Sequence, residues 1–280
     1  MKEILIAFGI FAALGLALGL LLALAAKLFA VKTDERVEQI AEILPGANCG
    51  GCGFAGCHAL AEAIVKGEAK PNACVASGAD KVAKIAAIMG VEAEQGVRMR
   101  AQVMCSGTHE FAKKKYIYEG LQDCAAASRL AGGSKLCPNG CVGLGTCVQT
   151  CAFNAISVVD GVAVVDYDLC KGCGMCVQAC PKHLIELIPY DSKHWVGCKS
   201  CDNGKITRFY CDVGCISCRM CEKSCPTGAI TVDENVAHID YSKCIGCDAC
   251  VDKCPRKIIW SSEVQDDGLV ISRAKINLNV

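Results

Sequence analysis

The most extended pattern in the sequence is an apolar run near its start. No charged residue occurs from Ile4 to Ala26, and at a helical rise of about 1.5 Å per residue these 23 residues would cover roughly 34 Å. This length predicts a helix that crosses a bilayer once. A cleaved signal peptide is the alternative, but its apolar region should be shorter and its start more positive than Lys2 and Glu3.

Basic residues follow the apolar run, at Lys27, Lys32 and Arg36. Because positively charged flanks stay in the cytoplasm, the rest of the chain is expected on that side of the cell (inner) membrane, anchored by a single pass. Cysteine thiols remain reduced in this compartment.

Shorter patterns predict a mixture of helices and strands after the anchor. Val37, Ile40, Ala41 and Leu44 fall on one face of a helix that Thr33 would cap and that Pro45-Gly46 would end. Apolar and polar residues alternate in 156–164 and in 230–239, which predicts two hairpins, the first turning at Asp160-Gly161. The expected fold class is α+β.

The composition adds 25 cysteines in 280 residues. Disulfides are disfavoured, because disulfide-rich proteins are usually small and secreted, whereas this chain is long and its cysteines form closely spaced runs. Zinc usually takes paired C-x2-C knuckles around one tetrahedral site. Runs of three or four cysteines favour iron–sulfur clusters.

The first run has the spacing C-x2-C-x4-C-x16-C and consists of Cys49, Cys52, Cys57 and Cys74. Four glycines between 48 and 57 let the backbone fold closely around a ligand. A [4Fe–4S] cluster on four thiolates is the natural interpretation, and zinc on the same four residues stays open.

An internal repeat occupies the region from Cys137 to Cys254. One constant shift along the chain, the shift that takes Cys137 onto Cys211, superimposes eight cysteines on eight others. The first set is Cys137, Cys141, Cys147, Cys151, Cys170, Cys173, Cys176 and Cys180. The second set is Cys211, Cys215, Cys221, Cys225, Cys244, Cys247, Cys250 and Cys254.

The runs ending in Pro181, Pro226 and Pro255 read C-x2-C-x2-C-x3-C-P and resemble the bacterial two-cluster ferredoxin. In that family three cysteines of a run bind one cluster and the fourth binds its neighbour. The resemblance implies three ligand sets: Cys215, Cys218, Cys221 and Cys254; Cys244, Cys247, Cys250 and Cys225; Cys170, Cys173, Cys176 and Cys151.

The remaining set departs from the ferredoxin pattern, because Leu144 occupies the place that Cys218 has in the second copy. Cys137 is expected to replace the missing ligand. The predicted set is therefore Cys137, Cys141, Cys147 and Cys180.

Five cysteines remain outside these five clusters: Cys105, Cys124, Cys198, Cys201 and Cys211. Cys198-x2-Cys201 and Cys211 could form three corners of a sixth site, with Cys105 or Cys124 as the fourth. Reduced, buried thiols are the alternative.

The order of these features resembles the B subunit of the Rnf complex over essentially the whole chain. The resemblance rests on the apolar helix, on Asn48-Cys49-Gly50-Gly51-Cys52-Gly53, and on the ferredoxin-like runs. It implies an anchor at 1–32, a 4Fe-4S domain at 33–90, a connecting α/β segment at 91–134, ferredoxin modules at 135–190 and 211–262, a linker insertion at 191–210 and a tail at 263–280.

The resemblance implies an electron-transfer subunit of a membrane ferredoxin:NAD⁺ oxidoreductase that exports Na⁺ or H⁺. Soluble ferredoxin would be the electron donor, and partner subunits would carry the flavin and the NAD site. No catalytic residue is expected in this chain, and its net charge of zero gives no reason to expect nucleic acid. A subunit of another membrane redox complex and a zinc scaffold are the alternatives.

Overall fold

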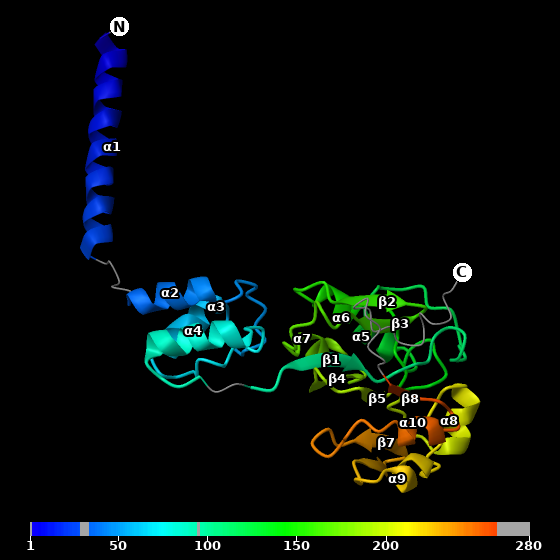
Figure 1. Ribbon diagram of the computed structural model, residues 1–280. Helices are drawn as coiled ribbons and strands as arrows, with labels where there is room; N and C mark the ends of the chain where they lie inside the picture. The colour runs from blue at the N-terminus through cyan, green and yellow to red at the C-terminus, as the bar shows by residue number, and fades with distance from the viewer. Residues whose placement is uncertain (1, 29–33, 94–95, 262–280) are drawn as a thin grey trace.

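The computed structural model describes residues 2–28, 34–93 and 96–261. Along the chain they form a long helix, then a small three-helix domain, then a body of short helices and two-stranded sheets (Figure 1). This mixture confirms the α+β prediction. Thr33, the expected helix cap, and the expected tail at 263–280 lie outside the described residues.

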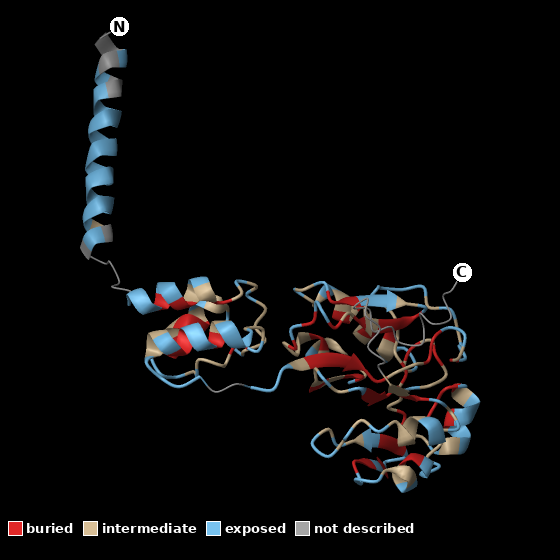
Figure 2. Ribbon diagram, viewed as in Figure 1, coloured by how far each residue is buried: buried red, intermediate tan, exposed pale blue. Residues whose placement is uncertain are grey.

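Helix α1 spans Lys2–Leu28 and stands apart from the rest of the chain (Figure 1). Its described side chains are exposed along its length (Figure 2), with Phe11 74% and Leu21 67% accessible. Counted over the residues that the structure describes, no helix has both the length and the apolar character needed to span a membrane.

The small domain consists of α2 (Glu35–Ile43), α3 (Cys57–Val65) and α4 (Ala79–Met89). The Asp34 side chain accepts a hydrogen bond from the Arg36 backbone N–H, so the cap of α2 is Asp34. The apolar face predicted for this helix is buried against α3 and α4. Its core contains Val37, Ile40, Leu44, Leu60, Ile64 and Ile85.

The body contains two copies of one unit, each with a hairpin, short helices and a second two-stranded sheet. The first copy has β1 (Met99–Val103), α5 (Cys124–Arg129), α6 (Thr146–Gln149), β2 (Ile156–Val159), β3 (Val162–Val165), α7 (Met175–Ala179) and β4 (Ile185–Pro189). The second has β5 (His194–Val196), α8 (Gly204–Tyr210), α9 (Met220–Ser224), β6 (Ile230–Asp233), β7 (Val236–Ile239), α10 (Ala249–Lys253) and β8 (Ile259–Ser261).

Both predicted hairpins are confirmed. Strand β2 pairs with β3, and β6 pairs with β7, in both cases antiparallel. Asp160 and Gly161 both have positive φ, and so do Glu234 and Asn235. Two successive left-handed residues make the tight turn whose twist matches that of a hairpin.

The second sheet of each copy joins strands that are distant in sequence. Val103 of β1 faces Ile185 of β4, and Val196 of β5 faces Ile259 of β8. The repeat shift takes Ile185 onto Ile259, so β1 and β5 hold equivalent places although the same shift does not take Val103 onto Val196. Residues 191–210, expected as a linker insertion, therefore contain a strand of the second copy.

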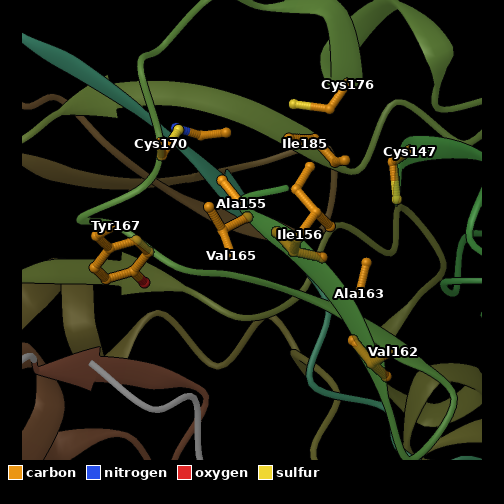
Figure 3. Close-up of a cluster of buried hydrophobic side chains, with 12 residues drawn as sticks. Cys147, Ala155, Ile156, Val162, Ala163, Val165, Tyr167, Cys170, Cys176 and Ile185 are labelled. Carbon is orange, nitrogen blue, oxygen red and sulfur yellow. The ribbon is translucent and has the colours of Figure 1, made fainter. Parts of the chain in front are cut away.

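Cysteines form part of both cores in this body. In the first copy Cys147, Cys170 and Cys176 lie among Ile156 and Ile185 (Figure 3). The core of the second copy is built in the same way and includes Cys215, Cys221, Ile230, Val232, Val236 and Ile259. Aliphatic strand residues and cysteine thiols thus share the core of each copy.

Aromatic rings and hydrogen bonds hold the two copies together. Trp195 and Trp260 of the second copy stack with ring centroids 6.4 Å apart, and Tyr167 of the first meets Trp195 edge-on at 6.4 Å. Trp260 Nε1 donates to Ser106 Oγ at 3.1 Å, and the Ser106 N–H donates to the Gly197 carbonyl at 2.9 Å. The cysteine loops of both copies are therefore fixed relative to each other.

Candidate metal centres

The ferredoxin-like runs share one local geometry. Cys147, Cys176, Cys221 and Cys250 each occupy the second position of a short helix, α6, α7, α9 or α10. The residue before each helix is left-handed, which turns the preceding loop back over the helix start. The last cysteine of each run lies within two residues of the end of the helix, so the sequence spacing brings the thiols of a run close together.

The first predicted set lies in the small domain, where Cys49, Cys52, Cys57 and Cys74 line one pocket. Asn48 shapes this loop, because its Oδ1 accepts a hydrogen bond of 2.8 Å from the Cys57 N–H. The structure thus brings all four residues of the C-x2-C-x4-C-x16-C motif together.

Both predicted sets of the second module are also brought together. Cys225, Cys244, Cys247 and Cys250 line one pocket. In the other set, burial and then the neighbouring thiolates of Cys215, Cys254 and Cys218 raise the pKa of Cys221 to about 12. Cysteines of both runs therefore lie near one another in the second module.

In the first module the set formed by Cys151, Cys170, Cys173 and Cys176 follows the same arrangement. Burial, followed by the thiolates of Cys170, Cys173, Cys147 and Cys151, raises the pKa of Cys176 to about 12. Backbone N–H groups face these sulfurs: Ala155 donates to Cys151 Sγ at 3.4 Å. The equivalent Ala229 donates to Cys225 Sγ at 3.2 Å in the second module.

The set predicted with Cys137 is not gathered in one pocket. Cys141, Cys147 and Cys180 share a pocket, but the fourth cysteine in its lining is Cys124, and Cys137 lines a different pocket. Burial and then the Cys124 thiolate raise the pKa of Cys147 to about 11, with Cys180 the next contributor.

Hydrogen bonds explain why Cys124 reaches this place. The Cys124 N–H donates to Thr146 Oγ1 at 2.8 Å, and Thr146 Oγ1 donates to Asp123 Oδ2 at 3.1 Å. Asp123 also caps α5 by accepting from the Ala126 N–H at 2.7 Å. The start of α5 is thereby fixed beside the start of α6, which carries Cys147. Spacing could not place Cys124 in this pocket, because Cys124 belongs to no run.

Four of the leftover and reassigned cysteines meet between the two modules: Cys105, Cys137, Cys198 and Cys211 line one pocket. Burial raises the pKa of Cys198 to about 12, and burial likewise raises that of Cys211 to about 11. Cys201, expected beside Cys198, is exposed and does not line this pocket.

The small domain approaches the first module at its cysteine loop. A methyl group on Gly51 would lie 2.6 Å from the Cys173 carbonyl oxygen, so only glycine permits this contact. Burial raises the pKa of Cys173, and the Cys49 thiolate adds to that shift. The cysteine set of the small domain therefore borders the set of Cys151, Cys170, Cys173 and Cys176.

All 25 cysteines are free thiols. Within the described residues, no three or more His, Cys, Asp or Glu side chains are grouped so as to hold a single metal ion.

Comparison with known proteins identifies relatives over nearly the full chain. The B subunit of the ion-translocating oxidoreductase complex of Methanosarcina acetivorans is 44% identical over 92% of this chain and 99% of its own length. The chain belongs to this family of oxidoreductase B subunits. A second relative is the B subunit of the Na(+)-translocating ferredoxin:NAD(+) oxidoreductase complex of Acetobacterium woodii, 47% identical over 92% of this chain and 78% of its own length. A third is the B subunit of the proton-translocating ferredoxin:NAD(+) oxidoreductase complex of Clostridium ljungdahlii, 42% identical over 86% of this chain and 87% of its own length.

Family models match this B-subunit chain in three places. A model described as "Putative Fe-S cluster" covers residues 44–76, a "4Fe-4S binding domain" covers 163–186, and a "4Fe-4S dicluster domain" covers 214–258. The iron–sulfur character of the small domain and of both modules is thereby confirmed. Nine cysteines lie outside these three matches: Cys105, Cys124, Cys137, Cys141, Cys147, Cys151, Cys198, Cys201 and Cys211.

Proposed function

We propose that this chain is the iron–sulfur electron-transfer subunit of a membrane complex that oxidises reduced ferredoxin, passes the electrons to partner subunits with flavin and NAD sites, and exports Na⁺ or H⁺. Membership of the B-subunit family and the names of its relatives support this proposal. The two named relatives that differ in their ion, Na⁺ and H⁺, have similar identity to this chain, so the ion is not assigned.

The observation that carries the proposal is the convergence of cysteines in sets of four. The sets assigned to [4Fe–4S] clusters are Cys49, Cys52, Cys57 and Cys74; Cys151, Cys170, Cys173 and Cys176; Cys124, Cys141, Cys147 and Cys180; Cys215, Cys218, Cys221 and Cys254; Cys225, Cys244, Cys247 and Cys250. A bound [4Fe–4S] cluster supplies one-electron chemistry, with a potential set by burial, charge and hydrogen bonds to sulfur.

The donor set fits this cofactor. Thiolates are the ligands of such clusters, and the backbone N–H groups of Ala155, Leu184 and Ala229 point at ligand sulfurs at 3.2–3.5 Å. These donors stabilise negative charge on sulfur. The residues of this chain thus hold, insulate and tune the carriers, and chemistry at flavin or NAD is left to partner subunits.

Helix α1 is proposed as the membrane anchor, with the remaining domains on the cytoplasmic side. Its apolar side chains are exposed on the isolated chain, and Lys27 lies in its last turn. Carbonate extraction of native membranes should leave the full chain in the pellet. A variant with Leu18→Lys and Leu22→Lys should move to the supernatant, whereas Lys27→Gln should not, and release of the unaltered chain would refute the anchor.

Anaerobic purification from the native membrane tests the electron-transfer role. The preparation should be brown and contain at least about twenty irons per chain, with electron paramagnetic resonance signals after reduction. In a rapid-mixing experiment, reduced ferredoxin should reduce the clusters of the purified protein. Subunits with covalent flavin should copurify with it. A colourless protein with stoichiometric zinc would refute the proposal, and copurification with an unrelated quinone-linked or corrinoid-linked complex would move the chain to another redox system.

A further inference from the structure

The pocket between the two modules has a symmetric construction. Cys137 and Cys211 hold equivalent positions in the internal repeat. Cys105 and Cys198 each lie two residues after the end of equivalent strands, β1 and β5. Each module therefore contributes the same two cysteine positions to one shared pocket.

Hydrogen bonds to sulfur repeat this symmetry. The Cys141 N–H donates to Cys105 Sγ at 3.4 Å, and the equivalent Cys215 N–H donates to Cys198 Sγ at 3.4 Å. Cys141 and Cys215 are themselves assigned to clusters of the first and second module. The shared pocket is thus in direct contact with one cysteine set on each side.

The size and surroundings of the pocket suit a bulky cofactor better than packed thiols. Its open space, including the mouth, is about 390 Å³, within the range of 340 to 410 Å³ at three other four-cysteine pockets. Gly107 lies against it, where a methyl group would be 3.4 Å from Cys211 Sγ and 3.8 Å from Cys105 Sγ. The backbones on either side are tied together, because the Asp212 N–H donates to the Phe111 carbonyl at 2.9 Å.

The lining of this pocket includes a buried cation. Lys135 is 3% exposed, and its ammonium group donates to the Gly107 carbonyl at 2.6 Å and the Gly161 carbonyl at 2.8 Å. Among the residues that the structure describes, no carboxylate forms an ion pair with it. A buried charge without a counter-charge is costly. A cluster on four thiolates is an anion and would supply that counter-charge.

We propose that Cys105, Cys137, Cys198 and Cys211 bind a sixth [4Fe–4S] cluster that links the cluster pairs of the two ferredoxin modules. This inference rests on the proposed function, since it needs clusters on both sides. One electron passing along this line oxidises the cluster that gives it and reduces the one that receives it, and no bond is made or broken.

Iron counting on the full anaerobic chain tests the site. The unaltered protein should contain about twenty-four irons, and Cys211→Ala should contain about twenty. Cys201→Ala is the matched control, because Cys201 lies close in sequence but is exposed outside the pocket; it should keep the full content. About twenty irons in the unaltered chain and in both variants would refute the sixth cluster while leaving the proposed function intact.

A variant with all four cysteines changed to alanine separates loss of one cluster from general collapse. Because the four residues serve one cluster, it should lose the same four irons as Cys211→Ala, and spin quantification of the reduced protein should fall by one cluster. Progressive loss with each added substitution would refute a single shared site. Near-absence of iron in the unaltered chain would instead refute the proposed function itself.

Discussion

The two ferredoxin modules have the same strands, hairpins and helix pairs, yet they complete their cysteine sets differently. In the second module Cys218 lies within the run, whereas Leu144 fills its place in the first and Cys124 comes from α5 instead. Cys198, which lines the pocket between the modules, corresponds to Cys105, because each lies two residues after the end of equivalent strands. Similar spacing of the cysteine runs therefore does not imply that the fourth cysteine of each set comes from the same place in the chain.

Removal of iron is expected to have the largest effect, and it should unfold the two modules before it unfolds the small domain. The module cores combine small strand residues with cysteines, whereas α2–α4 bury Ile40, Leu60, Ile64 and Ile85. Since metal binding contributes folding free energy directly, chelation under mild oxidation should unfold residues 99–261 first. Hydrogen exchange should show amide protection lost there and retained in α2 and α3. Equal loss in both regions would contradict this contrast.

The next prediction compares a cysteine at position 124 with a cysteine at position 144 as the fourth ligand of this set. Cys124→Ala should lose about four irons, since one cluster loses a thiolate. Adding Leu144→Cys should restore them, because it recreates the spacing of the second module. Iron analysis and electron paramagnetic resonance measure both variants, and Leu144→Ala in the same background is the control that should not restore iron. Retention of all iron in Cys124→Ala would return the assignment to Cys137.

Sequence patterns predicted the regular parts of this molecule because those parts depend on local spacing. The hairpins, the apolar face of α2 and the sets built from complete C-x2-C-x2-C-x3-C runs follow from residues close together in the chain. Cys124 and Cys105 could not be placed in this way. Their positions depend on α5 docking to Thr146 and on β1 pairing with β4, contacts between segments that lie far apart along the chain.

The sequence does not predict strand β5 for a similar reason. Its equivalence to β1 appears only in the register, since the repeat shift takes β4 onto β8 but does not take β1 onto β5. A segment without its own complete cysteine run was therefore interpreted as a linker. Its three residues are buried, and Trp195 among them packs against Met104 and Ile188 of the first module.

Arg100 offers a smaller test of the same comparison. It is 1% exposed and donates to the carbonyls of Tyr190 at 3.2 Å and Ser192 at 2.9 Å, while its guanidinium lies 3.6 Å from the Tyr167 ring centroid. Arg100→Met leaves those acceptors unpaired and should lower the free energy of unfolding by about 2 to 4 kcal/mol.

Lys193 is the matched control for this substitution, because it holds the equivalent position before β5 and is exposed. Lys193→Met should change the free energy of unfolding by less than about 0.5 kcal/mol. Anaerobic thermal unfolding at constant iron content measures both variants. Equal effects would mean that Arg100 contributes no more than a surface residue.

The smallest expected effect concerns acid and the Asp123 carboxylate. The pKa of Asp123 lies below its usual range, mainly because its carboxylate accepts a hydrogen bond from the Ala126 N–H. Desolvation raises this pKa in part, and the hydrogen bond from Thr146 lowers it further. A lowered folded-state pKa means that the carboxylate stabilises the fold above the ordinary Asp value, and that this contribution is lost as pH falls through the folded pKa. The Asp123→Asn variant should therefore lose iron from the Cys124 set slightly faster than the unaltered chain at neutral pH. This difference in the rate of iron release should become smaller as the pH is lowered below about 4. Iron release followed by chelator absorbance over this range measures it, and a difference that grows with acid would show that Asp123 does not hold Cys124 in place.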